Sequence, residues 1–356
     1  MPWTLTGAEL PKKTLSAMMA RGRLPHALLF TGPAGGGKFT MALDLAKAVN
    51  CLSPFPDGSP CGICVSCAKT RNLTHPDLSL VFPKGKAARI PIDDIRNLRE
   101  YLAFKPYEGK TKVAIVRGAE RFSEESGGAL LKTLEEPTPD TLLVLTANSA
   151  GNVMTTLVSR CLSMRIPPLS REEILKALKY EKDLEGDKAE LAAGLSGGAL
   201  GAALGMDEDM AWFVWTRIEN VFKKQRGLPR LTAAMKLSAA FAEELEKLKA
   251  VKDDPDYVRA NEFLDLFCAS LRLWFRDAAV IASLGPKNFA PDGGENDLRR
   301  FIEGPAPSEV QIRFSRSVSP KRLNDWDKAV SRLSDSVSRY INADLVFRNF
   351  WLSVLD

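Results

Sequence analysis

A glycine loop between an apolar segment and a helical segment constrains this sequence more than any other feature. Residues 26–31 (HALLFT) predict a short buried strand, and residues 39–50 (FTMALDLAKAVN) predict a helix. Between them, the run GPAGGGK at 32–38 matches the first seven positions of the phosphate-binding P-loop pattern. Such glycines let backbone N–H groups surround a phosphate at a helix start, and the lysine reaches its outer oxygens. The residues predicted to contact the phosphate are Gly32, Gly35, Gly37 and Lys38.

Strands and helices alternate over the first half of the chain. Further strands are predicted at residues 78–82, 112–116, 141–147 and 163–166, and further helices at 92–102 and 126–134. The strands are continuous apolar runs, which indicates a parallel sheet covered by helices on both faces, and hence an α/β fold. An earlier helix is predicted from a period near 3.6 residues in Leu10, Leu15, Met18 and Met19.

The positions that would hold a metal ion beside the loop carry no metal ligands. The eighth P-loop position, where a Ser or Thr hydroxyl holds Mg²⁺, is Phe39. Thr40 lies about 100° further around the helix and is not expected to face the same point. The strand at 112–116, where acids that hold the metal and orient water are expected, is followed by Arg117 and Gly118. The sequence therefore predicts a loop that keeps its phosphate contacts but has lost Mg²⁺ and hydrolysis.

Four of the six cysteines fall within residues 51–67, in a loop rich in Pro, Gly and Ser. The four thiolates of Cys51, Cys61, Cys64 and Cys67 suit a tetrahedral Zn²⁺ site, and in a cytosolic chain a metal is favoured over disulfides. Because protein ligands fill all four positions, we expect structural zinc, with an iron–sulfur cluster as the alternative. The other two cysteines, Cys161 and Cys268, are predicted to be ordinary buried residues, and His26 and His75 to be structural.

The second half of the chain shows helical spacing only. Residues 169–206 predict short helices that end in a Gly- and Ala-rich stretch, and residues 284–296 predict a loop. The clearest apolar stripe consists of Leu323, Trp326, Val330, Leu333 and Val337. A chain of 356 residues has room for two or three domains.

The charge distribution permits contact with phosphate but does not require it. The net charge is +5, and residues 1–168 carry +7, from 21 Lys and Arg against 14 Asp and Glu. The sequence contains no run long enough for a membrane span and no secretory signal at its start. We expect a cytoplasmic protein.

Several short motifs resemble those of clamp-loader subunits of the AAA+ family. The string ALLKTLEEP at 129–137 and the triplet Ser159-Arg160-Cys161 are similar to two signatures of these subunits. The segments at 23–27 (RLPHA) and 75–77 (HPD) are also typical, and the closing run at 342–345 (NADL) resembles the end of family members. The resemblance covers residues 1–206 well and the remainder weakly.

The resemblance implies three domains. These would be a RecA-like AAA+ domain at 1–168 with an inserted zinc module at 51–67, a small helical lid at 169–208 and a helical collar at 209–356. It also implies that Arg160 reaches ATP on a neighbouring subunit as an arginine finger. Residues 146–148 (TAN) correspond to the sensor-1 region, where Asn148 is either the sensor residue or only a cap at the end of the strand. The lid stretch at 198–204 lacks the sensor-2 arginine. The implied partners are gamma/tau-type motor subunits and a clamp-opening delta subunit in a hetero-pentamer, a sliding clamp and primed DNA.

Three functional interpretations follow. The missing metal ligands and sensor-2 arginine favour a delta-prime-type stator that does not hydrolyse ATP. An active gamma/tau-type motor is the alternative, and it would require Thr40 and Glu120 to replace the missing ligands, although Glu120 is predicted to be a surface carboxylate. A P-loop nucleotide-binding enzyme unrelated to DNA is the third, which would leave the cysteine cluster and the Ser-Arg-Cys triplet unexplained.

Overall fold

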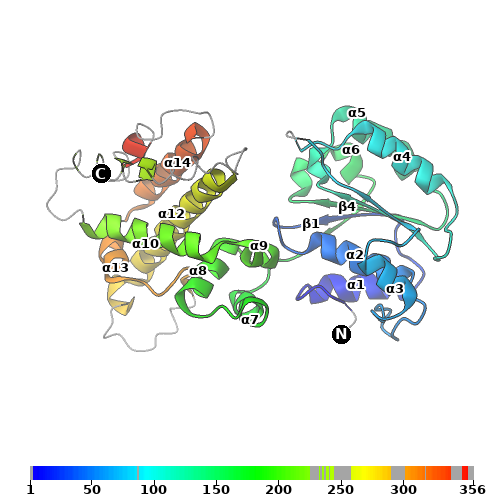
Figure 1. Ribbon diagram of the computed structural model, residues 1–356, viewed down its shortest axis with the longest axis horizontal. Helices are drawn as coiled ribbons and strands as arrows, with labels where there is room; N and C mark the ends of the chain where they lie inside the picture. The colour runs from blue at the N-terminus through cyan, green and yellow to red at the C-terminus, as the bar shows by residue number, and fades with distance from the viewer. Residues whose placement is uncertain are drawn as a thin grey trace. The chain divides into compact units, whose positions relative to one another are not determined.

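The computed structural model describes residues 3–85, 88–224, 232, 235, 238–239, 241–243, 258–289, 301–316, 318–337 and 347–351. The chain divides into two compact units, one formed by residues 1–173 with 198–202 and the other by residues 174–197 with 203–356. The first unit contains the strands of Figure 1, and the described residues of the second form helices and the turns between them, without a strand. The predicted division into three domains stays a prediction.

A five-stranded parallel sheet forms the centre of the first unit, in the order β2-β3-β4-β1-β5. The strands are β1 (Ala27–Thr31), β2 (Leu78–Val81), β3 (Lys112–Arg117), β4 (Thr141–Ala147) and β5 (Leu162–Arg165). At the carboxyl edge, Thr31 of β1 pairs with Ala147 of β4, and Arg117 of β3 pairs with Thr146 of β4. The glycine loop and the segments that follow β3 and β4 therefore start from the same edge of the sheet.

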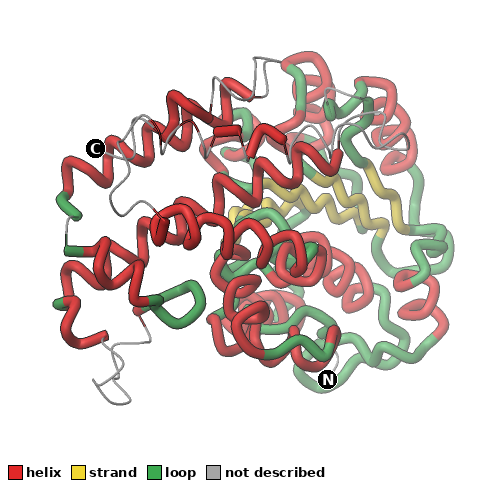
Figure 2. The backbone as a smooth tube through the Cα atoms, turned by 60° about the vertical axis from the view of Figure 1, so that its left-hand side comes forward, coloured by secondary structure: helices red, strands yellow, loops and turns green. Residues whose placement is uncertain are grey.

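Helices cover both faces of this sheet, which Figure 2 shows in yellow. The helices of the first unit are α1 (Glu9–Ala20), α2 (Lys38–Val49), α3 (Val65–Arg71), α4 (Ile92–Ala103), α5 (Glu124–Glu135) and α6 (Thr155–Val158). Successive strand residues point to opposite faces of the sheet. On one face, Leu28 packs with Leu15 of α1 and Met41 of α2. On the other face, Leu29 packs with Leu98 of α4 and with residues of α5 and α6. The predicted α/β fold, a parallel sheet with helices on both faces, is confirmed.

The buried face of α1 differs from the prediction. Leu15 is fully buried as expected, but Leu10 is 76% exposed and Pro11 is buried in its place. A 3.6-residue period does not by itself tell which of two adjacent residues faces the sheet, and here Pro11 does.

The second unit is a helical assembly around one aromatic core. Its helices are α7 (Arg171–Lys182, whose first turn belongs to the first unit), α8 (Gly186–Ser196), α9 (Leu200–Gly205, shared likewise), α10 (Glu208–Lys224), α12 (Val258–Leu284), α13 (Glu309–Ser315) and α14 (Pro320–Val337). Trp274 of α12 stacks on Phe222 of α10 with ring centres 4.3 Å apart. The predicted stripe of α14 buries Trp326, Val330 and Leu333 in the same core.

Two details of the second half qualify the sequence predictions. Within the predicted loop at 284–296, residues Pro286–Phe289 form a short 3-10 helix, and residues 290–296 lie outside the described residues. The closing motif at 342–345 and the side chain of Val337 also lie outside them. Across the described helices, none has the length and apolar character that a bilayer crossing requires.

Candidate functional site

The glycine loop lies between β1 and α2, as its sequence predicts. Gly35 and Gly37 adopt φ values of +74° and +83°, in the left-handed region that side chains disfavour. Gly37 is directly followed by Lys38, the first residue of α2, so the N–H groups at the start of α2 belong to the loop. The backbone therefore has the form that a phosphate-binding loop requires.

Lys38 is held at the carboxyl edge of the sheet by three oxygen acceptors. Its Nζ donates to the carbonyl oxygens of Gly32 and Pro33 at 2.7 and 2.6 Å, and to Oδ1 of Asn148 at 3.2 Å. Asn148 directly follows β4, which pairs with β1. The sheet thus brings together the predicted phosphate-binding lysine and the predicted sensor residue.

An aromatic pair occupies the place where a magnesium ligand is expected. Phe39 is half-buried, and the centre of its ring lies 5.7 Å from the ring of Phe82, which follows β2. At the end of β3, Arg117 is exposed and Gly118 turns the chain with φ +75°. Hydrocarbon and a cation stand where oxygen ligands would be needed, which disfavours a bound divalent cation.

Glu120 lies within electrostatic reach of the loop, which the sequence did not indicate. The sequence predicts Glu120 to be a surface carboxylate, but its Oε2 atom is buried. This oxygen has no hydrogen-bond partner among the described residues. Burial lowers the pKa of Lys38, the negative charge of Glu120 opposes this shift, and the positive charge of Arg117 adds to it. Glu120 therefore acts as a nearby counter-charge for Lys38.

The start of α9 contacts the glycine loop through its backbone. The N–H of Gly201 donates to the carbonyl oxygen of Gly35 at 2.9 Å. A Cβ atom on Gly35 would lie 2.7 Å from the nitrogen of Ala202, so this approach requires glycine at position 35. The backbone of residues 198–202, which belong to the first unit, thus packs on the loop without a sensor-2 arginine.

The N-terminal segment is fastened to α2 by a buried carboxylate. Asp44 accepts the backbone N–H groups of Thr4 and Leu5 at 2.7 and 2.9 Å and pairs with Lys47 at 3.0 Å. Leu5 then lies over Gly37, where any side chain would collide with it. Sequence reasoning missed Asp44, because a single acid inside an apolar helix gives no indication of its partners.

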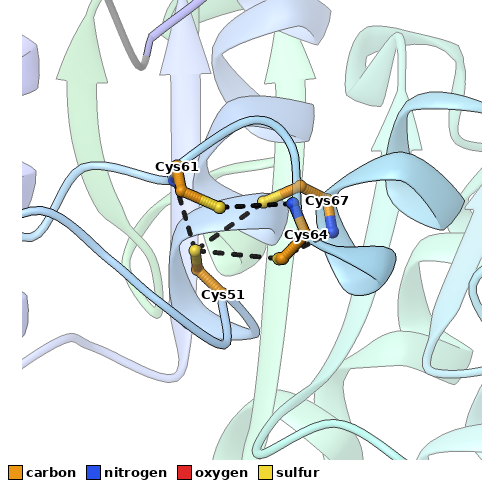
Figure 3. A group of neighbouring side chains, drawn as sticks. All are labelled: Cys51, Cys61, Cys64 and Cys67. Atoms are coloured by element: carbon orange, nitrogen blue, oxygen red, sulfur yellow. Dashed lines mark hydrogen bonds between the residues drawn. The ribbon is translucent and has the colours of Figure 1, made fainter.

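The four clustered cysteines converge, as Figure 3 shows. Their Sγ atoms all lie within 4.8 Å of one another, with 4.0 Å between Cys51 and Cys64 and 3.7 Å between Cys51 and Cys67. Four sulfurs at about 2.3 Å from a central ion would be about 3.8 Å apart, so the arrangement fits a tetrahedral metal site. Backbone N–H groups of Cys61 and Cys64 also point at sulfurs, at 3.2 and 3.3 Å. The residues present can hold a metal ion.

Two polar side chains attach this cysteine loop to the sheet. Asn50, directly before Cys51, accepts from the N–H groups of Lys110 and Thr111 at 2.8 and 2.9 Å and donates to the Thr111 carbonyl at 2.8 Å. His75 contacts Ser66 of α3 at 3.1 Å and is buried, as expected of a structural histidine.

Asp77 supports the adjoining loop with a buried carboxylate. It accepts three backbone N–H groups, those of Tyr107, Glu108 and Gly109, at 2.6 to 2.9 Å. Burial raises the pKa of Asp77 and these N–H groups lower it, with a net downward shift. Sequence reasoning placed Asp77 only in a motif and gave it no role.

The candidate arginine finger lies at the end of α6. The Arg160 side chain is 35% exposed, and its guanidinium pairs with Glu135 at 2.6 Å. Among the described residues, Arg160 and Lys38 share no hydrogen-bond partner. The candidate finger and the lysine of the glycine loop therefore belong to separate sets of hydrogen bonds.

Comparison with known proteins shows which proteins the first half of the chain resembles. Residues 8–170 match the family model described as "DNA polymerase III, delta subunit". A delta-prime subunit from Bacillus subtilis is 34% identical over 52% of this chain and 54% of that protein. Over about half of its length the chain is thus similar to the delta-prime and gamma/tau subunits of DNA polymerase III clamp loaders. This similarity favours a clamp-loader relative over a P-loop enzyme unrelated to clamp loaders.

Relatives of the tau and gamma types match the chain as well. The tau subunit of Escherichia coli is 32% identical over 49% of this chain and 27% of that protein. Among solved structures, a gamma subunit-related protein from Thermotoga maritima aligns at 19% identity and a TM-score of 0.44, covering 96% of this chain and 97% of that one. The chain spans about half the length of the delta-prime relatives it matches.

The structure also shows the surroundings of the other residues singled out in the sequence, one histidine and two cysteines. His26 contacts the carbonyl oxygen of Leu134 through Nε2 at 3.1 Å, although its side chain is exposed. Cys268 is buried in the helical core as predicted, whereas Cys161 is only partly buried against the sheet. No disulfide joins any of the six cysteines.

Proposed function

We propose that this chain is a delta-prime-type stator of the bacterial clamp loader, which does not hydrolyse ATP itself. The observation that carries the proposal is the Phe39–Phe82 pair beside Arg117 at the place of the magnesium ligands. The loop keeps its glycines and Lys38, so a phosphate can still be contacted while the metal and the attacking water lack their ligands. The chain would bind nucleotide without turning it over, or would leave the loop unused.

In this role the chain supplies Arg160 to ATP bound by a neighbouring gamma/tau-type subunit. A guanidinium at the γ-phosphate stabilises transition-state charge and contributes about 10³–10⁵ in rate in related systems. The exposed position of Arg160 at the end of α6 supports a contact made outside the chain. The helices of residues 209–356 would assemble the ring as its collar, with residues 169–208 as the lid.

The wider setting follows from the same proposal. The ring would hold the clamp-opening delta subunit, act on the sliding clamp and primed DNA in the cytoplasm, and use Zn²⁺ at Cys51, Cys61, Cys64 and Cys67 as a structural ion. Zinc suits a set of four thiolates and would leave no open coordination position, so it would stabilise the fold rather than activate water.

Steady-state ATP hydrolysis by the reconstituted complex tests the proposal. The mixture contains this chain, the motor and delta subunits of its organism, the clamp and primed DNA. Arg160→Ala should lower the rate at least about 100-fold, given what such fingers contribute, whereas Lys38→Ala and the control Arg165→Ala should leave it nearly unchanged. An isolated wild-type chain that hydrolyses ATP, and stops when Lys38 is replaced, would contradict the stator.

The second candidate is an active gamma/tau-type motor, and one observation favours it. Glu120 has a buried, unpartnered carboxylate oxygen near Lys38, where an acid could serve a metal. The two candidates predict opposite effects of Glu120→Gln on nucleotide binding. In a stator, loss of this negative charge strengthens ATP binding by roughly threefold or more, because like charges repel. In a motor, the same change weakens Mg²⁺-dependent binding and ends hydrolysis.

A further inference from the structure

Two sequence motifs that lie 25 residues apart meet in the fold. Glu135 is the last residue of α5, and its Oε1 accepts from both Nε and Nη2 of Arg160, at 2.9 and 2.6 Å. Glu135 belongs to the ALLKTLEEP string and Arg160 to the Ser-Arg-Cys triplet.

The backbones on both sides of this ion pair are fixed by the core. Leu134, directly before Glu135, is 3% exposed, and Leu157, three residues before Arg160, is fully buried. Both leucines pack in the same cluster beneath the sheet. Since each element is anchored, the pair forms between two rigid positions rather than between loose loops.

The guanidinium has few hydrogen-bond donors left over. Of its five N–H groups, Nε and one on Nη2 bind Glu135, while Nη1 donates to the Thr156 carbonyl at 3.0 Å and to the Ser159 hydroxyl at 3.3 Å. These four hydrogen bonds use four of the five N–H groups, so one N–H on Nη2 remains for another acceptor. Of these acceptors, only Glu135 carries a charge.

We propose that Glu135 is the positioning residue of the arginine finger. This inference rests on the proposed function of Arg160. The carboxylate fixes one edge of the guanidinium, so the side chain does not have to be ordered when a neighbour's nucleotide arrives. The pair is half-exposed, with the Glu135 side chain 50% accessible, so a more highly charged phosphate can replace some of its contacts.

Glu135→Gln tests this in the reconstituted complex with saturating clamp and primed DNA. The amide keeps the size and one acceptor oxygen but loses the charge that holds the finger. We expect kcat for ATP hydrolysis to fall about three- to tenfold, the cost of disordering one long side chain, with KM for ATP unchanged. Glu136→Gln, which alters the next exposed carboxylate, should have no effect.

A second comparison separates positioning from a general structural role. With Arg160→Lys as background, Glu135→Gln should change kcat by less than about twofold, because the interaction of two contacting residues is not additive. Thermal unfolding should be the same for all of these variants. A full effect of Glu135→Gln in that background would overturn the inference.

The outcomes distinguish the two proposals. If Arg160→Ala leaves the rate unchanged, the proposed function itself fails. If Arg160→Ala lowers the rate but Glu135→Gln behaves like Glu136→Gln, only the positioning role fails. A rate that rises with Glu135→Gln would show a restraint on the finger instead, and would also overturn the inference.

Discussion

The rings of Phe39 and Phe82 pack in a tilted arrangement, with an angle of 54° between their planes. Phe39 belongs to the first turn of α2 and Phe82 directly follows β2, so the contact spans the strand edge beside the glycine loop. Offset and edge-on aromatic pairs of this kind add stability beyond the area they bury. A packed apolar contact thus stands where a metal ligand is expected. Replacing Phe39 with a residue that can bind a metal would remove this contact.

Phe39→Thr alone is expected to leave ATP hydrolysis by the isolated chain at the level of a buffer blank. The hydroxyl returns, but Arg117 and Gly118 still provide no acid at the end of β3. Phosphate release in the presence of Mg²⁺ measures this, with Phe82→Leu as a control for loss of the aromatic contact. Mg²⁺-dependent turnover by Phe39→Thr would mean that Glu120 supplies the missing acid.

Purified protein is expected to contain one zinc ion per chain, bound by the four converging sulfurs. Cys64→Ser should reduce the zinc content close to zero, because three thiolates hold the ion far less tightly. Cys268→Ser is the matched control, since that thiol is buried in the helical core, and should leave the zinc content unchanged. Elemental analysis after gel filtration gives the stoichiometry, and iron in place of zinc would identify the alternative cluster.

Asp77 should make the loop at 107–109 sensitive to acid. The pKa of Asp77 is lower in the folded chain than in the unfolded chain, where it is about 3.9. The stability that the ionised carboxylate adds to the folded chain is therefore complete above the unfolded pKa, and it is lost as the pH falls through the folded pKa. The protection of the Tyr107, Glu108 and Gly109 amides against hydrogen exchange, corrected for the intrinsic rate, should be constant from neutral pH to about 4 and fall below it.

Asp77→Asn should remove this pH dependence and destabilise the first unit by about 2–3 kcal/mol, the cost of weakening hydrogen bonds to a charged group. The surface substitution Asp93→Asn serves as a control. Unchanged amide protection in Asp77→Asn would show that other contacts hold the loop.

Trp274→Ala should destabilise the helical unit by about 3–5 kcal/mol, through the cavity left beside Phe222 and Phe314. Five of the six tryptophans belong to the helical unit. Tryptophan fluorescence during urea unfolding therefore reports mainly on the unfolding of this unit and little on that of the first unit, which contains the sheet. Tyr180→Ala, at a position 87% exposed, should cost less than about 0.5 kcal/mol. Equal unfolding midpoints for the two variants would contradict the role of the aromatic core.

The sequence predicts the sheet well because its strands are continuous apolar runs. The strand β4, for example, spans residues 141–147 in both the prediction and the structure. The glycine loop was equally predictable, since its spacing is set by the geometry of one ligand group. Leu10 shows the limit, because hydrophobic periodicity locates a helix face only to within about one residue.

Contacts between distant residues could not be predicted in this way. Glu120 lies within electrostatic reach of Lys38, on the 3-10 turn Ala119–Arg121 that follows the left-handed Gly118, and no hydrophobic pattern encodes such a turn. The Glu135–Arg160 pair depends on the packing of α5 beside α6, which follows from the sheet and not from either motif. Asp77 is similar, since its three partners lie some thirty residues further along the chain.

One helix joins the two chemically distinctive parts of the first unit. Helix α2 begins at Lys38 in the glycine loop and ends at Val49, two residues before Cys51. Twelve helical residues span roughly 18 Å. The cysteine cluster and the glycine loop therefore adjoin opposite ends of the same helix. A chelator that removed the proposed metal ion, or an oxidant of the thiols, would free the cysteine loop at the far end of α2, while Asn50 keeps its hydrogen bonds to Lys110 and Thr111. Any effect of damage at the cluster on the glycine loop would therefore have to pass along α2, because the two lie at opposite ends of this helix.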